Sequence, residues 1–255
     1  MHPAFIAGPI AAGVFATGIT VYGAAHPRSQ IFGPTICRTN SPRKLAITFD
    51  DGPNPTITLK LLDLLDRYQA RATFFVIGRF ARECPELLRE TIARRHVLGN
   101  HTETHPNLFW LTPQQIRDEL RRCNDAINSA TGAPPKWFRP PFGLRNPWVA
   151  PAAQQLAQRV LMWTLIPDDW RRGTAEWLIR RMQPIAAHAQ RNLGNISNPA
   201  ANGTGDILCL HDGSHLQQNG DRTRTLTALE YWLPRWRDLG LEFVTIEDAV
   251  HTPAP

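Results

Sequence analysis

Apolar runs and helically spaced apolar positions alternate along most of the chain. The run at residues 44–49 predicts a buried strand, and apolar side chains recur at helical spacing over 56–68. We predict further strands at 71–77, 160–165, 207–210 and 241–246, and further helices at 85–95, 112–130, 149–158, 174–190 and 223–239. Thr112 before Pro113 suits the first turn of a helix. Six or seven strand–helix units over about 210 residues predict an α/β fold whose parallel sheet forms a closed or nearly closed barrel.

The first residues differ from the rest of the chain. No charged side chain occurs from Pro3 to Ala25, a stretch rich in Ala, Gly, Ile, Val, Phe and Thr. Such a segment is long enough to cross a bilayer, and the small residues at 23–25 would also suit a signal-peptide cleavage site. We predict an apolar signal or anchor segment at 1–25, a polar linker at 26–42 and a folded domain at 43–250. Asn, Gly, Pro and Ser predict a long loop at 192–205.

The composition is that of a soluble globular protein, with 42% hydrophobic and 20% charged residues in 255. It excludes a disordered chain, a coiled coil and a polytopic membrane protein. The formal net charge is +6, but Lys and Arg are scattered and never occur in runs longer than two. We therefore expect no nucleic-acid partner. Four cysteines without a CxxC pair leave the redox compartment open, and Cys209, within an apolar run, is expected to be a buried thiol.

Polar clusters follow several of the predicted strands. Asp50 and Asp51 end the strand at 44–49, and adjacent side chains of a strand point apart, so the two carboxylates can do separate jobs. A plain turn at 51–53 is the alternative. His101 and His105 are four residues apart and can share a metal ion, although Pro106 favours a single turn or a loop there over a long helix.

Further clusters lie toward the C-terminus. Arg139 ends an apolar stretch, where a partly buried guanidinium needs a carboxylate partner. His211 ends the apolar run at 207–210, with a purely structural histidine as the alternative, and Asp169 follows the run at 160–165. The carboxyl ends of barrel strands converge on one face, so these groups are expected to meet. Together they supply the functional groups that metal-assisted hydrolysis needs, with one residue as the base and another as the acid.

The order of the clusters and the residues in them resemble the sequence motifs of the NodB-type polysaccharide deacetylases, carbohydrate esterase family four. The motifs of that family are TFDDGP, H-[ST]-x-x-H, R-x-P-[FY], D-x-x-D-W and L-x-H. The chain has TFDDGP at 48–53, HTETH at 101–105, RPPF at 139–142, IPDDW at 166–170 and LCLHDG at 208–213. The resemblance covers about residues 43–250. It implies a distorted (β/α)7 barrel and a hydrolase that acts on carbon–nitrogen bonds other than peptide bonds.

The resemblance also implies the metal site and the base. Asp51, His101 and His105 would hold one divalent metal ion, with zinc as the first choice and cobalt, nickel or iron as alternatives. Asp50 would be the general base that takes a proton from water. Arg139 would pair with Asp50 and hold its carboxylate ionised and oriented.

The remaining roles concern the leaving group and the acyl group. By the same resemblance, His211 would protonate the leaving amine, and Asp169 would fix its tautomer and favour its charged form. The backbone N–H of Phe142 would stabilise the oxyanion. Trp170 and Leu210 would wall an apolar pocket for the acetyl methyl group. The chain departs from the family where Ile166 replaces the first Asp of D-x-x-D-W, which changes the expected substrate contacts.

The family implies an N-acetylated glycan as the substrate. We expect N-deacetylation of N-acetylglucosamine in a cell-envelope polysaccharide such as peptidoglycan, or in chitooligosaccharides, with release of acetate. The alternatives are deacylation (deacetylation or deformylation) of a lipid-linked amino sugar at the inner membrane, and O-deacetylation of xylan. Phe109, Trp110 and Trp148 are candidates for stacking on sugar rings. We expect a monomer, and a non-catalytic sugar-binding protein is the alternative from another class.

The location follows from the N-terminal segment. An apolar anchor or signal places the protein in the cell envelope, membrane-anchored or periplasmic and secreted. The positive-inside rule favours the alternative, a domain at the cytoplasmic face, because the nearest cations all follow the apolar segment and none precedes it. These cations are Arg28, Arg38, Arg43 and Lys44.

Overall fold

The computed structural model describes residues 18–194 and 203–250. The predicted apolar segment at 1–25 lies mostly outside the described residues, and so does most of the predicted loop at 192–205. Residues 18–25 are helical. Within the described ranges, no helix has the length and apolar character needed to cross a membrane.

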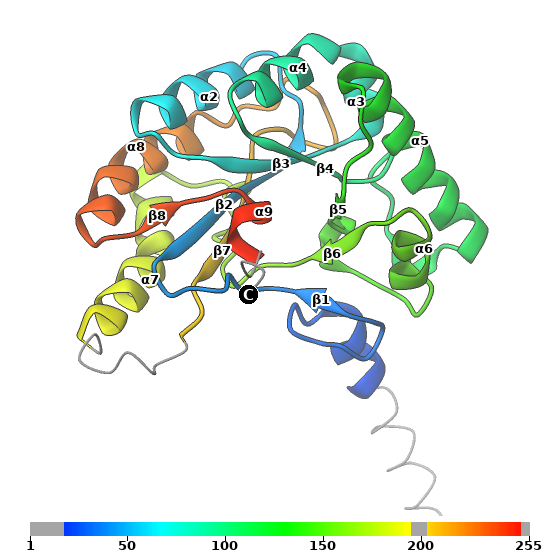
Figure 1. Cartoon of the computed structure of the whole chain (residues 1–255), viewed down its shortest axis with the longest axis horizontal. Coiled ribbons are helices and arrows are strands. Elements are labelled where there is room, and N and C mark those ends of the chain that lie inside the picture. Colours follow the sequence, from blue (N-terminus) through cyan, green and yellow to red (C-terminus); the bar gives the residue numbers. More distant parts are fainter. Residues whose placement is uncertain (1–17, 195–202, 251–255) are drawn as a thin grey trace, which may run out of the picture.

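Parallel strands form a single sheet at the centre of the described structure (Figure 1). Its order is β1–β6–β5–β4–β3–β2–β7, and β8 pairs with the start of β2. The strands are β1 (Thr35–Ile36), β2 (Lys44–Gly52), β3 (Ala72–Val76), β4 (Val97–Asn100), β5 (Trp137–Phe138), β6 (Arg159–Leu161), β7 (Asp206–His211) and β8 (Glu242–Phe243).

The sheet closes on itself. Leu165, just beyond the end of β6, forms a parallel bridge with Leu208 of β7, and the Cys209 N–H donates to the Leu165 carbonyl at 2.9 Å. Since β7 also pairs with β2, this contact completes a ring. The predicted distorted α/β barrel is confirmed.

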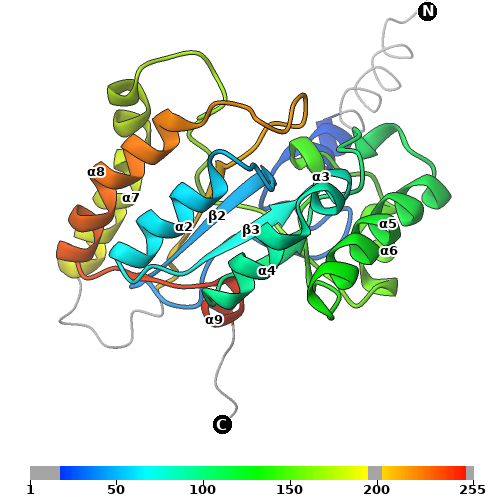
Figure 2. The same ribbon diagram turned by 90° about the horizontal axis from the view of Figure 1, so that it is seen from above.

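Helices surround the barrel, as the two perpendicular views show (Figures 1 and 2). They are α2 (Thr58–Arg67), α3 (Gly78–Glu83), α4 (Pro85–Ala93), α5 (Pro113–Thr131), α6 (Val149–Gln155), α7 (Ala175–Gly194) and α8 (Thr223–Asp238). A short helix, α9 (Ile246–Val250), lies instead at one end of the barrel, where it packs against inward side chains. Two 3₁₀ turns, η1 (Leu108–Trp110) and η2 (Pro141–Gly143), lie in the connections that follow β4 and β5.

Side-chain alternation gives the barrel an apolar wall and a two-part interior. Leu45, Ile47 and Phe49 of β2 point outward into the large core beneath the helices. Ala46 points inward and belongs to a second cluster with Phe75, Trp137, Leu161, Ile207 and residues of α9. Farther along β2, the inward positions are polar. The barrel is therefore plugged by apolar side chains at one end and lined by polar groups at the carboxyl ends of its strands.

Some predicted element boundaries are confirmed and others are wrong; the strand predicted at 160–165, for example, ends at Leu161 as β6. Helix α5 begins as predicted, with the Thr112 hydroxyl accepting from the Gln115 N–H at 3.3 Å. The predicted strand at 241–246 is too long, because β8 ends at Phe243 and α9 begins at Ile246. Thr245 explains the difference: its hydroxyl accepts from the Asp248 N–H at 3.3 Å and starts a helix.

The segment that we predict as a linker is in contact with the barrel. Strand β1 pairs with β6. Arg145 is 2% exposed, its backbone N–H donates to the Ala24 carbonyl, and its guanidinium donates to the His26 carbonyl at 2.7 Å. Residues around 23–36 therefore form part of the folded unit.

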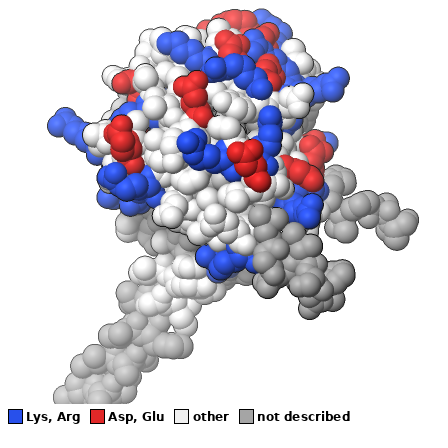
Figure 3. Space-filling view, turned by 90° about the vertical axis from the view of Figure 1, so that its left-hand side faces the viewer, with Lys and Arg blue, Asp and Glu red and all other residues white. Residues whose placement is uncertain are grey.

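Charged side chains of both signs share the face shown in Figure 3. Lys and Arg are interspersed there with Asp and Glu. Among the described residues of this face, no continuous basic stripe is visible, in keeping with the scattered cations of the sequence.

Candidate active site

The two adjacent aspartates reach the same cavity because β2 is irregular at its end. The pairing of β2 with β3 shifts between Asp50 and Gly52, and Asp51 has a φ of 72°. Such a bulge re-aims a side chain that regular alternation would send to the other side. The expectation that the two carboxylates point apart is therefore wrong, and both line one cavity. Gly213 permits this arrangement, since a Cβ there would overlap the Asp51 backbone.

Asp51 and the two motif histidines form a compact buried group. The Nε2 atom of His101 lies 3.6 Å from Asp51 Oδ1, and that of His105 lies 3.2 Å from the same oxygen. The histidines lie in the loop after β4, where His105 has a φ of 61°. The loop expected from Pro106 is confirmed. Among the described residues, these three side chains are one of two groups whose ligand atoms lie within 4.8 Å of one another.

The chemistry of this group fits a metal ion. Asp51 Oδ1 is buried and has no hydrogen-bond partner. His101 uses its Nδ1 to contact the Arg139 carbonyl at 2.8 Å, which leaves its Nε2 lone pair free. Burial, together with the neighbouring His101, lowers the pKa of His105 to about 3 and keeps that imidazole neutral. Burial alone would raise the pKa of Asp51, but His215 and three further histidines lower it, so the carboxylate stays ionised. Two imidazoles and one carboxylate are a typical zinc ligand set.

Arg139 holds Asp50 from inside the barrel. The guanidinium is fully buried, and its Nη1 donates to Asp50 Oδ1 and to the Thr48 hydroxyl, both at 2.7 Å. It lies over the Phe75 ring at 4.3 Å. The predicted partner of Arg139 is therefore in place. A buried charge-assisted pair of this kind fixes the orientation of the carboxylate.

His211 and Asp169 form a second buried pair. His211 Nδ1 lies 2.7 Å from Asp169 Oδ1, and the other carboxylate oxygen accepts from the His211 N–H and from the Thr225 hydroxyl, both at 2.9 Å. Burial opposes the charged imidazolium, but Asp169 outweighs it and raises the pKa of His211 to about 9. At pH 7 His211 is therefore a cation that carries a proton.

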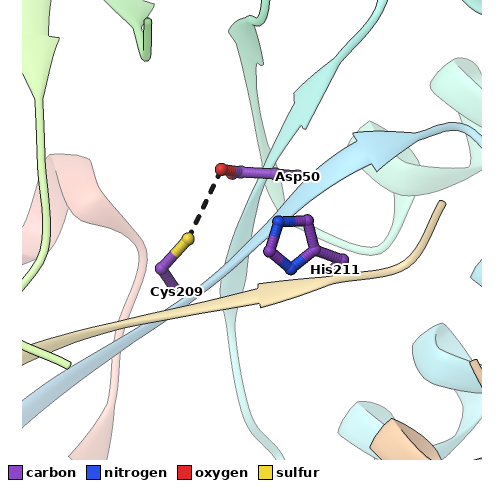
Figure 4. A group of neighbouring side chains, drawn as sticks. All are labelled: Asp50, Cys209 and His211. Atoms are coloured by element: carbon purple, nitrogen blue, oxygen red, sulfur yellow. Dashed lines mark hydrogen bonds between the residues drawn. The ribbon is translucent and has the colours of Figure 1, made fainter. Parts of the chain in front are cut away.

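Cys209 lies between the two pairs. Figure 4 shows its side chain with those of Asp50 and His211, and this trio is the second group of potential metal ligands among the described residues. The Cys209 thiol donates to Asp50 Oδ2 at 3.4 Å. Burial and the negative Asp50 raise the pKa of the thiol well above its ordinary value, so the thiol keeps its proton. The predicted buried thiol is confirmed, and it also touches the site.

Alternation along β7 corrects one predicted wall residue. Cys209 and His211 point into the barrel, so Leu210 points outward and packs in the core beneath the helices. Leu210 therefore does not wall the cavity. The leucine of the L-x-H pattern stands two residues before the histidine, which is the position of Cys209 in this chain.

The site opens into a cavity of about 360 Å³. Phe142 and Trp170 line it as predicted, with 54% and 41% of their surfaces exposed, and the Trp170 ring meets the His211 ring edge-on at 4.9 Å. Ile166 also lines it, so an apolar side chain occupies the cavity wall where the family pattern has a carboxylate. The remaining lining residues are Asp50, Asp51, His101, His105, Pro140, Gly143, Trp163, His211, Ser214, His215, Leu216 and Arg222.

Sequence reasoning missed the loop that follows β7. Ser214, His215 and Leu216 line the cavity, and the His215 ring stacks on the His105 ring at 4.3 Å. A histidine four residues after the motif histidine, in a loop rich in Gly, Ser and Asn, is the only signal that the sequence gives for this contact.

Comparison with known proteins shows the family of the chain. The model of the family described as polysaccharide deacetylase matches residues 38–161. A peptidoglycan-N-acetylglucosamine deacetylase of Bacillus cereus is 31% identical over 209 residues, which cover 82% of this chain and 89% of that protein. The chain belongs to the polysaccharide deacetylase family. A second relative in this family is a chitooligosaccharide deacetylase of a Bradyrhizobium species, 32% identical over 78% of this chain and 87% of that protein.

Solved structures of the polysaccharide deacetylase family have the same fold. A peptidoglycan N-acetylglucosamine deacetylase matches with a TM-score of 0.70 and 28% identity, over 86% of this chain and 93% of that one. A family 4 carbohydrate esterase from Streptomyces lividans, in complex with acetate, matches with a TM-score of 0.64 and 26% identity, over 81% and 92%. A pseudoenzyme of the family from Bacillus anthracis also matches, with a TM-score of 0.70 and 25% identity over 86% and 69%. The fold therefore occurs with and without activity, and the side chains of the site have to carry the functional argument.

Proposed function

We propose that this protein hydrolyses the N-acetyl group of N-acetylglucosamine in a cell-envelope polysaccharide such as peptidoglycan, or in chitooligosaccharides, and releases acetate. One observation carries the proposal. A metal-ligand group (Asp51, His101 and His105), a carboxylate held by Arg139 and a protonated histidine all line one cavity. Amide hydrolysis needs these three functions: activation of the carbonyl, a base for water and an acid for the amine.

Each residue has one task in this mechanism. Asp51, His101 and His105 would hold a divalent metal ion, which would supply Lewis acidity at the acetyl carbonyl. Asp50 accepts a proton from the attacking water, and Arg139 keeps the Asp50 carboxylate oriented. His211 donates its proton to the departing sugar nitrogen and is held in the productive tautomer by Asp169.

The cavity wall supports the choice of an acyl group on a sugar. Phe142 lines the cavity, and its backbone N–H would donate to the oxyanion. Trp170 provides an apolar face for the acetyl methyl group beside His211. Trp110 and Trp148 are 77% and 53% exposed and remain candidates for stacking on sugar rings. Ile166 removes a polar contact from the wall and would alter the choice among glycans.

Zinc is the metal that we propose, because a site of two histidines and one carboxylate leaves open coordination positions for substrate. Cobalt, nickel and iron also accept this ligand set. We further propose that residues 1–25 anchor or export the protein, that 43–250 form the catalytic domain, and that the protein acts as a monomer in the cell envelope. The relatives named for peptidoglycan and chitooligosaccharides support an envelope glycan as substrate.

Release of acetate tests the proposal. Chitooligosaccharides, peptidoglycan fragments and acetylxylan would be incubated with the full chain, with zinc and after chelation. We expect zinc-dependent acetate and a free amine from one of the first two substrates. Asp50→Asn keeps the shape of the base and should abolish release without loss of zinc. Acetate from acetylxylan alone would contradict N-deacetylation, and no acetate from the zinc-loaded protein would favour a non-catalytic role.

A further inference from the structure

The loop after β7 places His215 against the back of the metal-ligand group. The backbone N–H of His215 lies 3.3 Å from Asp51 Oδ2, and its Nδ1 lies 3.6 Å from the same oxygen. The backbone N–H and the ring Nδ1 of His215 therefore face one oxygen of Asp51. The ligand-atom group itself contains only Asp51, His101 and His105, so His215 lies outside it.

The two oxygens of Asp51 thus have different surroundings. Oδ2 faces His215, while Oδ1 is buried, has no hydrogen-bond partner and faces the Nε2 atoms of His101 and His105. A carboxylate held by donors on one oxygen presents the other oxygen in a fixed direction. Groups behind a ligand orient it, and their mutation typically costs about 10- to 100-fold in metal affinity or activity.

Residues outside the loop hold His215 in place. The ring stacks on His105 with an interplanar angle of 14°, and Phe142 meets it edge-on at 5.5 Å. Arg79, the second residue of α3, donates to the His215 carbonyl. The side chain keeps 33% of its surface exposed, so it lies at the cavity wall and is not part of the core.

We infer that His215 is a positioning residue of the metal site, which acts by holding Asp51 Oδ2 so that Oδ1 faces the two ligand histidines. The inference rests on the proposed metal site and adds a residue that no family motif contains. His215 does not bind the ion and does not move a proton in the reaction. It sets the affinity of the site.

Zinc affinity of the full chain, measured by competition with a chromogenic chelator, tests the inference. Two variants separate the possible roles of His215. His215→Phe keeps the ring that stacks on His105 and removes the Nδ1 donor. His215→Asn removes the ring and keeps an N–H near the Nδ1 position. We expect zinc binding to be about 10-fold weaker in His215→Phe. This lies at the lower end of the 10- to 100-fold loss of metal affinity that such mutations cause, because the backbone donor remains. For His215→Asn we expect a zinc affinity within about 3-fold of wild type.

Controls distinguish the failure of this inference from that of the proposed function. Leu216→Ala changes a neighbouring cavity-lining residue that is 82% exposed, and it should leave zinc affinity unchanged. His101→Ala should abolish binding. If the wild-type chain binds no zinc, the proposed metal site is wrong. If wild type binds zinc and His215→Phe binds it equally well, or if His215→Asn is the weaker of the two, the positioning role is wrong and the ring contact alone matters.

Discussion

Replacing Asp169 by asparagine removes the charge that keeps His211 protonated. The pKa of His211 lies at about 9 although burial lowers it, because the adjacent Asp169 carboxylate contributes the largest opposing effects and Asp51 and Asp50 add smaller ones. The ordinary value is 6.5, so at about 1.4 kcal/mol per pKa unit the surroundings favour the imidazolium by about 3 kcal/mol. Without Asp169, burial would act against only the two more distant carboxylates.

We therefore expect the basic limb of the kcat/KM profile to move from about pH 9 to lower pH in Asp169→Asn, by about 1–3 pH units, which is the usual effect of an adjacent opposite charge. An asparagine also cannot satisfy its neighbours. Asp169 accepts from His211 Nδ1 on one oxygen and from the His211 N–H and Thr225 on the other. An amide has only one oxygen, so at least one of these three donors meets an NH₂ group. A fall in kcat should accompany the shift.

The same pKa predicts a pH dependence of stability. The pKa of His211 is higher in the folded state than in the unfolded state, so its contribution is fully present below pH 6.5 and is lost as the pH rises through about 9. Urea unfolding of the wild type should show a loss of about 3 kcal/mol over this interval that Asp169→Asn lacks.

Asp168→Asn is the matched control. Asp168 precedes Asp169 in the chain but pairs with Arg181 at 2.5 Å, away from His211. Its replacement should leave the basic limb in place. A limb that stays at about pH 9 in Asp169→Asn, or that moves in Asp168→Asn, would refute the assignment of Asp169 as the partner of the acid.

Three further outcomes are expected. His101→Ala should lose bound zinc, as measured by elemental analysis, while its far-UV circular dichroism spectrum stays native. Its Tm should fall only by the amount that bound zinc adds to the Tm of the wild type. Arg139→Met leaves Asp50 buried without its cation, so urea unfolding should show a loss of about 3–5 kcal/mol, and an unchanged value would mean that water replaces the guanidinium. Deletion of residues 1–33 removes the carbonyl acceptors of buried Arg145, so it should destabilise the barrel by about 1–3 kcal/mol relative to deletion of 1–17, in the same assay.

The sequence alone predicts the alternation of strands and helices along the chain and most residues of the site. An apolar run such as 44–49 favours burial regardless of which elements pack against it. In a parallel barrel, the polar residues that follow such runs lie at the carboxyl face. The motifs at such ends predict seven site residues, and the structure brings them together. They are Asp50, Asp51, His101, His105, Arg139, Asp169 and His211.

Only the tertiary structure decided how these side chains are aimed. The bulge at Asp51 turns two adjacent carboxylates into one cavity, which depends on the pairing of β2 with β3 and on the space left by Gly213. Leu210 points away from the cavity, contrary to our prediction, because the direction in which a strand residue points depends on the register of the whole strand. His215 reaches Asp51 through a loop of irregular conformation, and local propensity carries no information about a contact made across 164 residues of chain.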